Sequence, residues 1–589
     1  MDISVILLPK IRVFASLSVA LALSLAAPRP ANAASLTIDA SQIDGVIPAI
    51  HGITNGPIIS NAPGSAPPCG NNHPADHTAR FQELKVPQTR THGGGEVDMD
   101  KLWLPYPEYA GHDPTDPNNY DWSRADAAVE QIIAAGSTPY LRFGHSKNHS
   151  SSGSCIANLN TRTPPDDFAV FAQVTRHILK HFLSGWDNGF TYDIEFVEVW
   201  NEFYIGEFWA GDGTQAAQLY EAVYNACKPD FPDVMLGPSI NKPTSQQNRI
   251  PWDFWDYVKD NEIPVDFISA HIYHKRPRML EDRVYRQTDR SWEFLFSYVG
   301  LPADTPIVNA EWNRDGGCYN TGKGQTIPAG AFVAGSLITM AGMHPQNSNH
   351  NLVMSHLFSA RSQLWTESSQ PKGPGVGIAA YAHLVENTPD RLSLTGPFST
   401  DDGVDFRAIA GTNEDGTEVG LLVSYYDITN TDCPGNADLG PPISLELEVQ
   451  NLPWGNGGFD WERWVHTSNG AMTLAESGSG SGGILQGTKT IQGNVLERYV
   501  LREAGCGNGI VAGAEQCDDG RINGSASSCC AGDCTFEPTG PANCDGELCT
   551  TGDSCDMGVC TPGDCRDGES CSVCGGSCST TQADCGCVF

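Results

Sequence analysis

Positively charged side chains are scarce in this sequence of 589 residues. Lys and Arg together number 35 against 70 Asp and Glu, which gives a formal net charge of −35 at pH 7. Phosphate backbones and anionic lipid headgroups repel such a polyanion, which argues against nucleic acids and membrane surfaces as partners. Charged residues make up only 18% of the chain, too few for a coiled coil or a charge-driven disordered protein. A neutral partner, such as a sugar, meets no electrostatic penalty.

The sequence also lacks an apolar run long enough to cross a bilayer. The run near its start, Val13 to Ala27, has 15 residues, whereas a spanning helix needs about 20. Lys10 and Arg12 precede this run, and the small residues Ala31-Asn32-Ala33 follow it. A basic start, a short apolar helix and a small-residue cleavage site are typical of a secretory signal. We therefore expect residues 1–33 to be removed and the mature protein to be secreted, or held at the cell surface, without membrane insertion.

Cysteine is rare over most of the chain and dense at its end. Five of the 20 Cys are spread over residues 1–505, and the other fifteen lie between Cys506 and Cys587. Such a tail is a disulfide framework in an oxidising compartment, and the absence of His from the tail disfavours zinc. Because fifteen is odd, at least one tail thiol pairs outside the tail, pairs between chains or stays free. The run Cys506 to Gly520 resembles Cys-rich repeats of secreted bacterial proteins, so residues 505–589 are expected to contact a surface or another protein.

Nucleotide-binding loops are missing too, because no G-x-G-x-x-G or Walker loop follows a strand. Strand patterns instead alternate with helical patterns, and apolar residues at helical spacing predict helices over 124–135 and 214–228. Eight such units predict an α/β fold, a (β/α)8 TIM barrel over residues 34–395. A doubly wound open sheet is the alternative, without its nucleotide signal. The strand candidates end near His51, His92, His145, Glu202, Pro238, Tyr273, Glu311 and Phe358.

Residues 396–504 change to a period of two. Short strand patterns, such as those over 406–410, 419–426 and 443–449, are separated by Gly, Asn and Asp turns. This pattern predicts an accessory β-sandwich. Within it, the Ser-Gly run from Ser477 to Gly483 is expected to be a flexible loop.

Two of the barrel strands deliver a carboxylate at their ends. The run Glu195-Phe-Val-Glu-Val-Trp-Asn-Glu202 ends in Asn201 and Glu202, and the run Thr305-Pro-Ile-Val-Asn-Ala-Glu311 ends in Glu311. Strict alternation would put Asn201 and Glu202 on opposite faces, so both point inward only if the strand bulges or turns there. The spacing between the two Glu fits three βα units, so they should face each other across the barrel mouth. Apolar rings beside Glu202 are expected to raise its pKa, as a general acid requires.

Two further strands add polar side chains near this pair. His271 and Tyr273 are two residues apart and share a strand face, and Arg90 and His92 do the same on an earlier strand. A cation and neutral donors beside a carboxylate nucleophile would keep it ionised and orient it. Paired His at helical spacing occur elsewhere without the Glu of a zinc motif, so no metal and no cofactor is expected.

These runs together resemble glycoside hydrolase family 39, which includes β-xylosidases and α-L-iduronidases. The resemblance is carried by Glu198-Val-Trp-Asn-Glu202, Phe267-Ile-Ser-Ala-His271-Ile-Tyr273, Ala310-Glu311-Trp312-Asn313 and, less firmly, Thr89-Arg-Thr-His92. It implies a retaining mechanism, with Glu202 as acid/base and Glu311 as nucleophile. It also implies that Asn201 binds the sugar 2-OH, while His271, Tyr273, Arg90 and His92 support the nucleophile and the substrate. Phe203 stands where the family usually has Pro.

The resemblance leads us to expect a secreted retaining glycoside hydrolase, most similar to a β-xylosidase, that cleaves O-glycosidic bonds in an oligosaccharide or polysaccharide. Two alternatives stay open. One is a carbohydrate-binding or adhesion protein with a decayed barrel. The other is a family relative that acts on a different sugar, such as an iduronidase-like or endoglycosidase-like enzyme.

Overall fold

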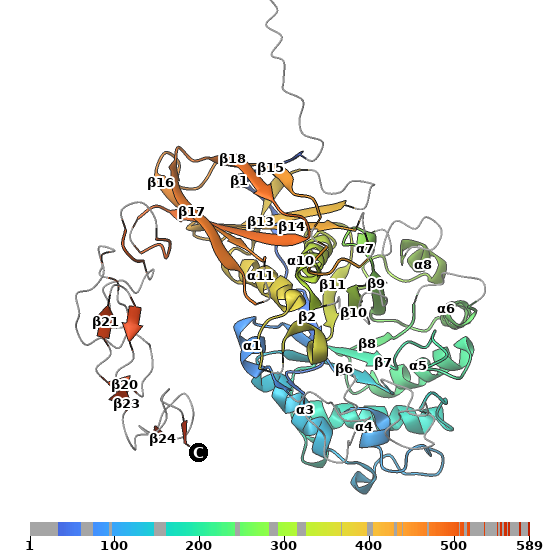
Figure 1. The fold of residues 1–589 in the computed structure, drawn as a ribbon. Coiled ribbons are helices and arrows are strands. Elements are labelled where there is room, and N and C mark those ends of the chain that lie inside the picture. Colours follow the sequence, from blue (N-terminus) through green and yellow to red (C-terminus); the bar gives the residue numbers. More distant parts are fainter. Residues whose placement is uncertain are drawn as a thin grey trace, which may run out of the picture.

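The computed structural model describes the chain from residue 33 to residue 505, and only scattered residues of the tail beyond it. The gaps are 60–74, 93–96, 146–160, 242–247, 282–291, 315–324 and 397–403, with shorter ones at 367, 429–430, 432, 439 and 468–469. The expected signal segment therefore lies outside the described residues, apart from its last position. Two large sheets make up the described chain, with a group of short strands at its C-terminal end (Figure 1).

The first sheet has eight parallel strands in the order β8-β7-β6-β5-β2-β11-β10-β9. A parallel bridge between Ser239, just after β8, and Ser269 on β9 joins its two ends. The sheet therefore closes into the expected (β/α)8 barrel. Its strands are β2 (His51–Thr54), β5 (Gln88–Arg90), β6 (Thr138–Phe143), β7 (Phe196–Val199), β8 (Met235–Pro238), β9 (Ile268–His274), β10 (Ile307–Arg314) and β11 (Leu352–Phe358). The first barrel strand begins at His51, where the sequence analysis expected it to end.

Helices surround the barrel and bury their apolar stripes against it. The helices expected over 124–135 and 214–228 are observed as α3 and α5, and Asp212 caps α5 by accepting the Gln215 backbone N–H. The full set is α1 (Thr78–Glu83), α2 (Met99–Leu102), α3 (Ser123–Ala134), α4 (Phe168–Ser184), α5 (Gly213–Cys227), α6 (Ile250–Asp260), α7 (Met279–Glu281), α8 (Trp292–Val299), α10 (Ile327–Ala341) and α11 (Gly373–Asn387), with short turns η1 (Pro117–Asn119), η2 (Trp186–Asn188) and η5 (Ala360–Leu364). Among the described residues, no helix combines the length and hydropathy that a bilayer crossing demands.

The second sheet has nine strands in the order β17-β16-β19-β14-β13-β12-β1-β15-β18. It curls on itself, so that Leu36 and Leu445 share a buried cluster with Phe406 and Leu421. The resulting double layer matches the expected accessory β-sandwich. Its strands are β1 (Ala33–Val46), β12 (Asp390–Thr395), β13 (Val404–Thr412), β14 (Glu418–Asp427), β15 (Ile443–Gln450), β16 (Gly458–Val465), β17 (Thr473–Ser481), β18 (Leu485–Ile491) and β19 (Val495–Glu503).

Two strands that fall within the expected barrel bounds, β1 and β12, belong to this second sheet. β1 pairs with β12 and β15, from Ala33 opposite Ser444 onward, so the boundaries at residues 34 and 396 need correction. The physical reason is the alternation of buried and half-buried residues in β1, which suits a sheet with one solvated face. A barrel strand of this kind is instead buried along its length, as β2 and β10 are.

The expected flexible Ser-Gly loop is wrong, because its residues Ser477 to Ser481 belong to the edge strand β17. Each residue from Gly478 to Gly480 pairs with a residue of β16. A Cβ at Gly478 would lie 3.1 Å from the Trp461 ring, and a Cβ at Gly480 would overlap the Phe459 ring. Glycine is therefore present because large rings of β16 cover this part of β17.

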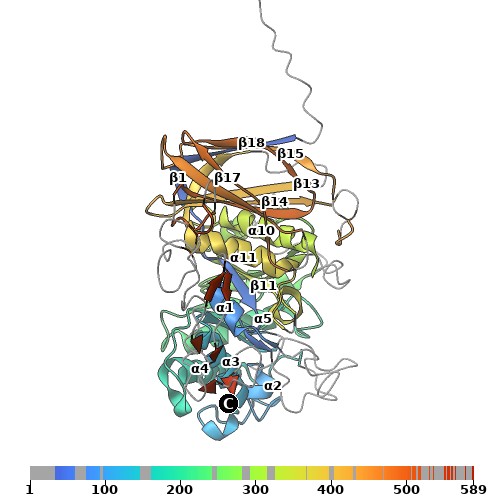
Figure 2. The same cartoon turned by 60° about the vertical axis from the view of Figure 1, so that its left-hand side comes forward.

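Helices α10 and α11 lie between the two sheets (Figures 1 and 2). Every residue of α10 is buried, as a helix covered on all sides requires. Leu422 and Leu496 from the second sheet join the same buried cluster as Phe332 of α10 and Tyr381 of α11. One continuous core therefore connects the barrel to the sheet.

The Cys-rich tail is described only in part. Cys517 and Cys530 form a disulfide, and Cys433 of the second domain is also disulfide-bonded. Asn508 anchors the start of the tail, since its Nδ2 donates to Asp460 Oδ2 at 2.9 Å. Most of the other tail cysteines lie outside the described side chains. The remaining short strands are β3 (Ile58–Ile59), β4 (Ala75–Asp76), β20 (Thr550–Thr551), β21 (Ser554–Asp556), β22 (Val559–Thr561), β23 (Asp564–Cys565), β24 (Ser577–Cys578) and β25 (Cys587–Val588).

Candidate active site

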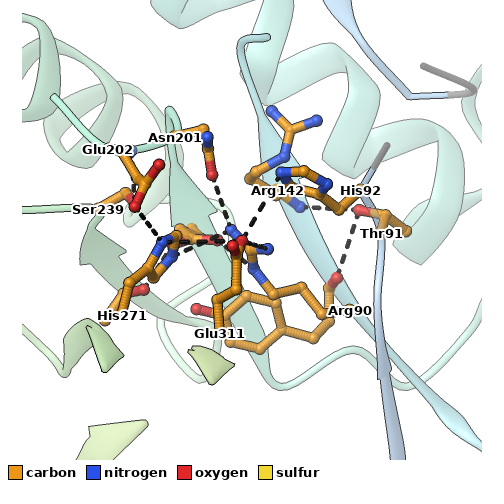
Figure 3. Close-up of polar contacts among 12 residues, drawn as sticks. Arg90, Thr91, His92, Arg142, Asn201, Glu202, Ser239, His271 and Glu311 are labelled. Carbon is orange, nitrogen blue, oxygen red and sulfur yellow. Dashed lines mark hydrogen bonds and ion pairs between the residues drawn. The ribbon is translucent and has the colours of Figure 1, made fainter. Parts of the chain in front are cut away.

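Glu202 and Asn201 lie at the barrel mouth, where the chain turns sharply after β7. Strand β7 ends at Val199, and both Trp200 (φ 70°) and Glu202 (φ 49°) adopt left-handed backbone conformations. Each such conformation costs about 1–3 kcal/mol and persists only where the surroundings enforce it. Here Ser239 Oγ accepts the Glu202 backbone N–H at 2.9 Å. The sequence required a bulge or turn here for Asn201 and Glu202 both to point inward. The turn meets this requirement, because it directs both side chains toward the same group of residues (Figure 3).

Glu311 reaches the same place from β10, the seventh barrel strand. The pairing of β10 with β9 shifts between Asn309 and Glu311, which marks a bulge, and Glu311 lies opposite His271. Bulges re-aim a side chain at the rim of a barrel. Since β7 is the fourth strand in chain order, the two Glu come from strands 4 and 7 of the ring.

His271 lies between the two carboxylates. Its Nδ1 is 3.1 Å from Glu202 Oε1 and 3.7 Å from Glu311 Oε2. Its Nε2 is 3.4 Å from Glu198 Oε1. Because one nitrogen contacts both Glu202 and Glu311, those two oxygens are separated by less than about 7 Å, the sum of the two distances. This limit includes the ~5–5.5 Å separation of retaining glycosidases and excludes most of the ~6.5–9.5 Å range of inverting ones.

A tyrosine hydroxyl holds each carboxylate as well. Tyr273 donates to Glu311 Oε1 at 2.6 Å, and Tyr204 donates to Glu202 Oε1 at 2.7 Å. The prediction that His271 and Tyr273 share a strand face agrees with these contacts, because both side chains reach Glu311.

Arg90 lies beneath these groups and is fully buried. Its Nη1 donates to Glu311 Oε2 at 3.2 Å, and its Nη2 donates to Asn201 Oδ1 at 3.1 Å. The buried Nδ2 of Asn201 has no partner among the described residues, which leaves a donor for a bound hydroxyl group. His92 is farther away, with its Nε2 3.8 Å from Glu311 Oε2 and its ring edge against Phe358. All seven residues singled out from the sequence therefore lie together around the carboxylate pair at the barrel mouth.

Sequence reasoning missed the buried carboxylate that holds the cations. Glu198 on β7 is fully buried, accepts Arg90 Nε at 2.8 Å and accepts the hydroxyl of Ser269. It thus binds both Arg90 and His271 on the side away from Glu311. The sequence did contain an indication of this role. Glu198 is a charged residue within an otherwise apolar strand, and it shares a strand face with Phe196. The sequence did not indicate that Tyr204 and Ser239 contact Glu202, because these contacts depend on the turn after β7.

The cluster balances its charge with one proton. Arg90 and His271 supply two positive charges against the carboxylates of Glu198, Glu202 and Glu311. The carboxylates outweigh the effect of burial on His271 and raise its pKa to about 9. The pKa of Glu198 is held low against burial by Arg90 and His271. A single additional proton on Glu202 or Glu311 therefore makes the buried group neutral, as an enclosed site favours.

The pKa directions of the pair differ from the sequence-based expectation. Burial raises the pKa of Glu202, but the contacts with His271 and Tyr204 outweigh it, so this pKa lies below its ordinary value. Burial and the neighbouring Glu202 raise the pKa of Glu311, although His271 and Arg90 oppose them. The expected rise in the pKa of Glu202 is thus wrong without substrate, because His271, which outweighs the burial of Glu202, comes from another strand.

One cluster beside the site consists of side-chain types that commonly bind metal ions. Ligand atoms of Asp98, Asp100 and His145 lie within 4.8 Å of one another. Arg142 contacts Asp98 and Lys101 contacts Asp100, so side-chain cations already neutralise both carboxylates. This arrangement is a buried ion-pair network rather than a set of free ligands.

Comparison with known proteins agrees with this geometry. Residues 77–367 match glycosyl hydrolases family 39. A β-xylosidase from Geobacillus stearothermophilus is 28% identical over 165 residues, which are 26% of this chain and 31% of the relative. The chain spans about a third of the length of the curated relatives it matches.

Solved structures share the fold. A glucosidase from Croceicoccus marinus superposes with a TM-score of 0.61 at 20% identity, over 80% of this chain and 99% of that one. A monomeric β-xylosidase from Caulobacter crescentus superposes with a TM-score of 0.56 at 15% identity, over 80% and 99%. The barrel and the second sheet are therefore an arrangement that occurs in other proteins.

Proposed function

Residues 77–367 belong to glycosyl hydrolases family 39, and on that premise we propose that this protein is a retaining glycoside hydrolase that releases xylose-type sugars. The observation that carries the proposal is the pair Glu202 and Glu311, both within 3.7 Å of one nitrogen of His271. Two carboxylates at this separation, at the mouth of a barrel, have the geometry of a double displacement.

In the first step Glu311 attacks the anomeric carbon while Glu202 donates a proton to the leaving oxygen. The bond between sugar and leaving group breaks, and a glycosyl-enzyme ester forms on Glu311. Glu202 then takes a proton from water, which attacks the same carbon and frees Glu311. Arg90 and Tyr273 donate hydrogen bonds to the Glu311 carboxylate before the attack. They stabilise its negative charge again when the ester is hydrolysed.

The proton of the pair must change place when the substrate binds. Without substrate, the pKa directions favour a proton on Glu311 over one on Glu202. A glycosidic oxygen beside Glu202 offers an acceptor there, while an electrophilic carbon beside Glu311 favours its ionised form. We expect the shift to occur within the pair, since His271 contacts both carboxylates.

Xylosides are the proposed substrates because the matched relatives are named β-xylosidases. Export from the cell belongs to the same proposal, since residues 1–33 have the order of a secretory signal and the tail is rich in Cys. Sequencing the N-terminus of the secreted protein checks the export, and an intact Met1 would contradict it.

The activity is tested by release of nitrophenol from aryl xylosides, glucosides and arabinosides. We expect turnover of the xyloside, loss of turnover by at least about 10³-fold in Glu311→Ala, and retention of the anomeric configuration by NMR. Glu195→Gln is the matched control, because this exposed Glu immediately precedes β7 and lies outside the site. Binding of every sugar without release would instead favour a carbohydrate-binding protein, and an inverted product would remove the double displacement.

A further inference from the structure

A cavity of about 190 Å³ lies between the barrel and the second sheet, away from the carboxylate pair. Its barrel side consists of α1, α11 and Trp365, and its sheet side carries Trp464 and Arg498. Ligand sites for drug-sized molecules occupy about 300–1,000 Å³. This cavity therefore has room for one sugar-sized group.

Arg498 is the unusual residue of this cavity. It lies on β19 opposite Trp464 of β16, and its guanidinium lies 5.5 Å from the centre of that ring. The buried Nε has no hydrogen-bond partner, and no carboxylate of the described chain forms an ion pair with this side chain. An arginine held this way in a chain with net charge −35 is an unused anion-binding group.

Two carboxylates, Glu462 and Glu418, attract the Arg498 guanidinium without forming an ion pair with it among the described residues. Glu462 accepts the indole N–H of Trp464 at 2.9 Å, and Glu418 pairs with Arg502 at 2.8 Å. Burial lowers the pKa of Arg498 to about 10, the direction expected for a cation that lacks a close counterion. On the far wall Glu83 is paired with Arg80, so the lining keeps one unbalanced positive charge.

The rest of the lining is apolar. Trp365 and Val376 are buried, while Met472 and Ala379 are half-buried along the wall. Indole and methyl groups pack against the C–H faces of a sugar ring, and a planar guanidinium binds a carboxylate through two parallel hydrogen bonds.

We propose that this junction cavity is a second, non-catalytic binding site for a carboxylated sugar, a uronic acid unit of an acidic glycan, whose carboxylate pairs with Arg498. The choice of a sugar over other carboxylates rests on the hydrolase function proposed above. Such a site would hold an acidic side group of a polymer while the main chain reaches the barrel mouth.

Isothermal titration calorimetry with D-glucuronate, D-glucose and acetate tests the site without any need for turnover. We expect D-glucuronate to bind at least tenfold more tightly than glucose, which lacks the charge, and acetate, which lacks the ring. Arg498→Gln should weaken glucuronate binding by tenfold or more. Ala379→Phe, which fills the cavity and leaves Arg498 intact, should do the same and covers the case that Arg498→Gln fails to fold.

Two controls separate this site from the catalytic one. Lys489→Gln removes a cation that lies over the Trp461 ring on the same sheet but outside the cavity, and it should bind as the wild type does. Glu311→Gln should keep glucuronate binding, and its loss there would place the ligand in the barrel and overturn the proposal. Equal binding of acetate and glucuronate, or no binding, would also overturn it. An enzyme inactive on every glycoside that still binds glucuronate through Arg498 would refute only the hydrolase function.

Discussion

Glu198 determines how the cations of the active site are aimed. It is fully buried and holds Arg90 Nε at 2.8 Å and His271 Nε2 at 3.4 Å, while Arg90 Nη1 and His271 Nδ1 face Glu311. Without this carboxylate, Arg90 and His271 would keep only partners on the catalytic side. Glu198 is therefore a positioning residue, which acts on the substrate through its neighbours.

We predict that Glu198→Gln lowers kcat/KM by about 10- to 100-fold, or ~1.4–2.8 kcal/mol. Removing this negative charge also lowers the pKa of His271, so the alkaline limb of the pH–rate profile should move to lower pH. The pH profile separates positioning from simple loss of structure. An unchanged profile with reduced activity would contradict the role, and Glu195→Gln again serves as the control.

The titration of His271 should affect stability at alkaline pH. Its pKa is raised to about 9 in the folded protein from about 6.5 when unfolded. The folded state therefore binds this proton more tightly, and the stabilisation is full below about pH 6.5 and is lost as pH rises through 9.

We predict that the free energy of unfolding falls between pH 7 and pH 9.5, by up to about 3 kcal/mol from this group. Urea unfolding at several pH values measures it, and His271→Gln should flatten the dependence over this interval. A wild-type stability that rises across the same interval would show that His271 is not charged in the folded state.

At the scale of single elements, the ends of strands decide the site. The strands themselves were predictable, because β7 is a mainly apolar run that precedes Glu202, and β10 begins with an apolar run that leads to Glu311. The left-handed turn at Trp200 and Glu202 was not, because neither residue type favours that conformation and the Ser239 contact comes from the next strand. Local sequence also could not reveal the pKa directions, since His271 acts on both carboxylates from β9 and Arg90 acts on them from β5.

The second sheet shows what local propensity misses. Gly and Ser have low β-propensity, so β17 was mistaken for a loop, although Phe459 and Trp461 of the partner strand cover its glycines. The alternation in β1 predicts a strand but does not state which sheet it joins, because its partners lie near residues 390 and 445. Both errors concern contacts between residues far apart in the sequence.

We predict that Gly480→Val destabilises the protein by about 1–3 kcal/mol, because the new side chain overlaps the Phe459 ring. Gly487→Val on β18, the strand at the other end of the sheet order, is the matched control, since a Cβ there meets no atom within 4 Å. Urea unfolding measures both variants. Equal stability of the two would show that β17 does not pack as described.

At the scale of the whole molecule, the tail is attached at the periphery. Its described start contacts the second sheet through Asn508, which donates to Asp460 and accepts from Arg502. None of the tail contacts described for residues 507–518 reaches a barrel residue named in the active site.

We therefore predict that deleting residues 505–589 leaves kcat/KM on aryl glycosides within about twofold of the full chain, a change below ~0.5 kcal/mol. Circular dichroism should show that the shortened chain is folded. A folded but inactive deletion would assign the tail a part in catalysis.

The place of β1 also constrains the order in which the chain folds. This first strand lies inside the nine-stranded sheet, with Ala33 beside Ser444 and Val46 beside Asp390. Its neighbours are synthesised only after the entire barrel, so the sheet cannot assemble while the ribosome is still making the early helices. Contacts of such high sequence separation form slowly. The second sheet of a chain with this topology therefore reaches its final state only after nearly complete synthesis.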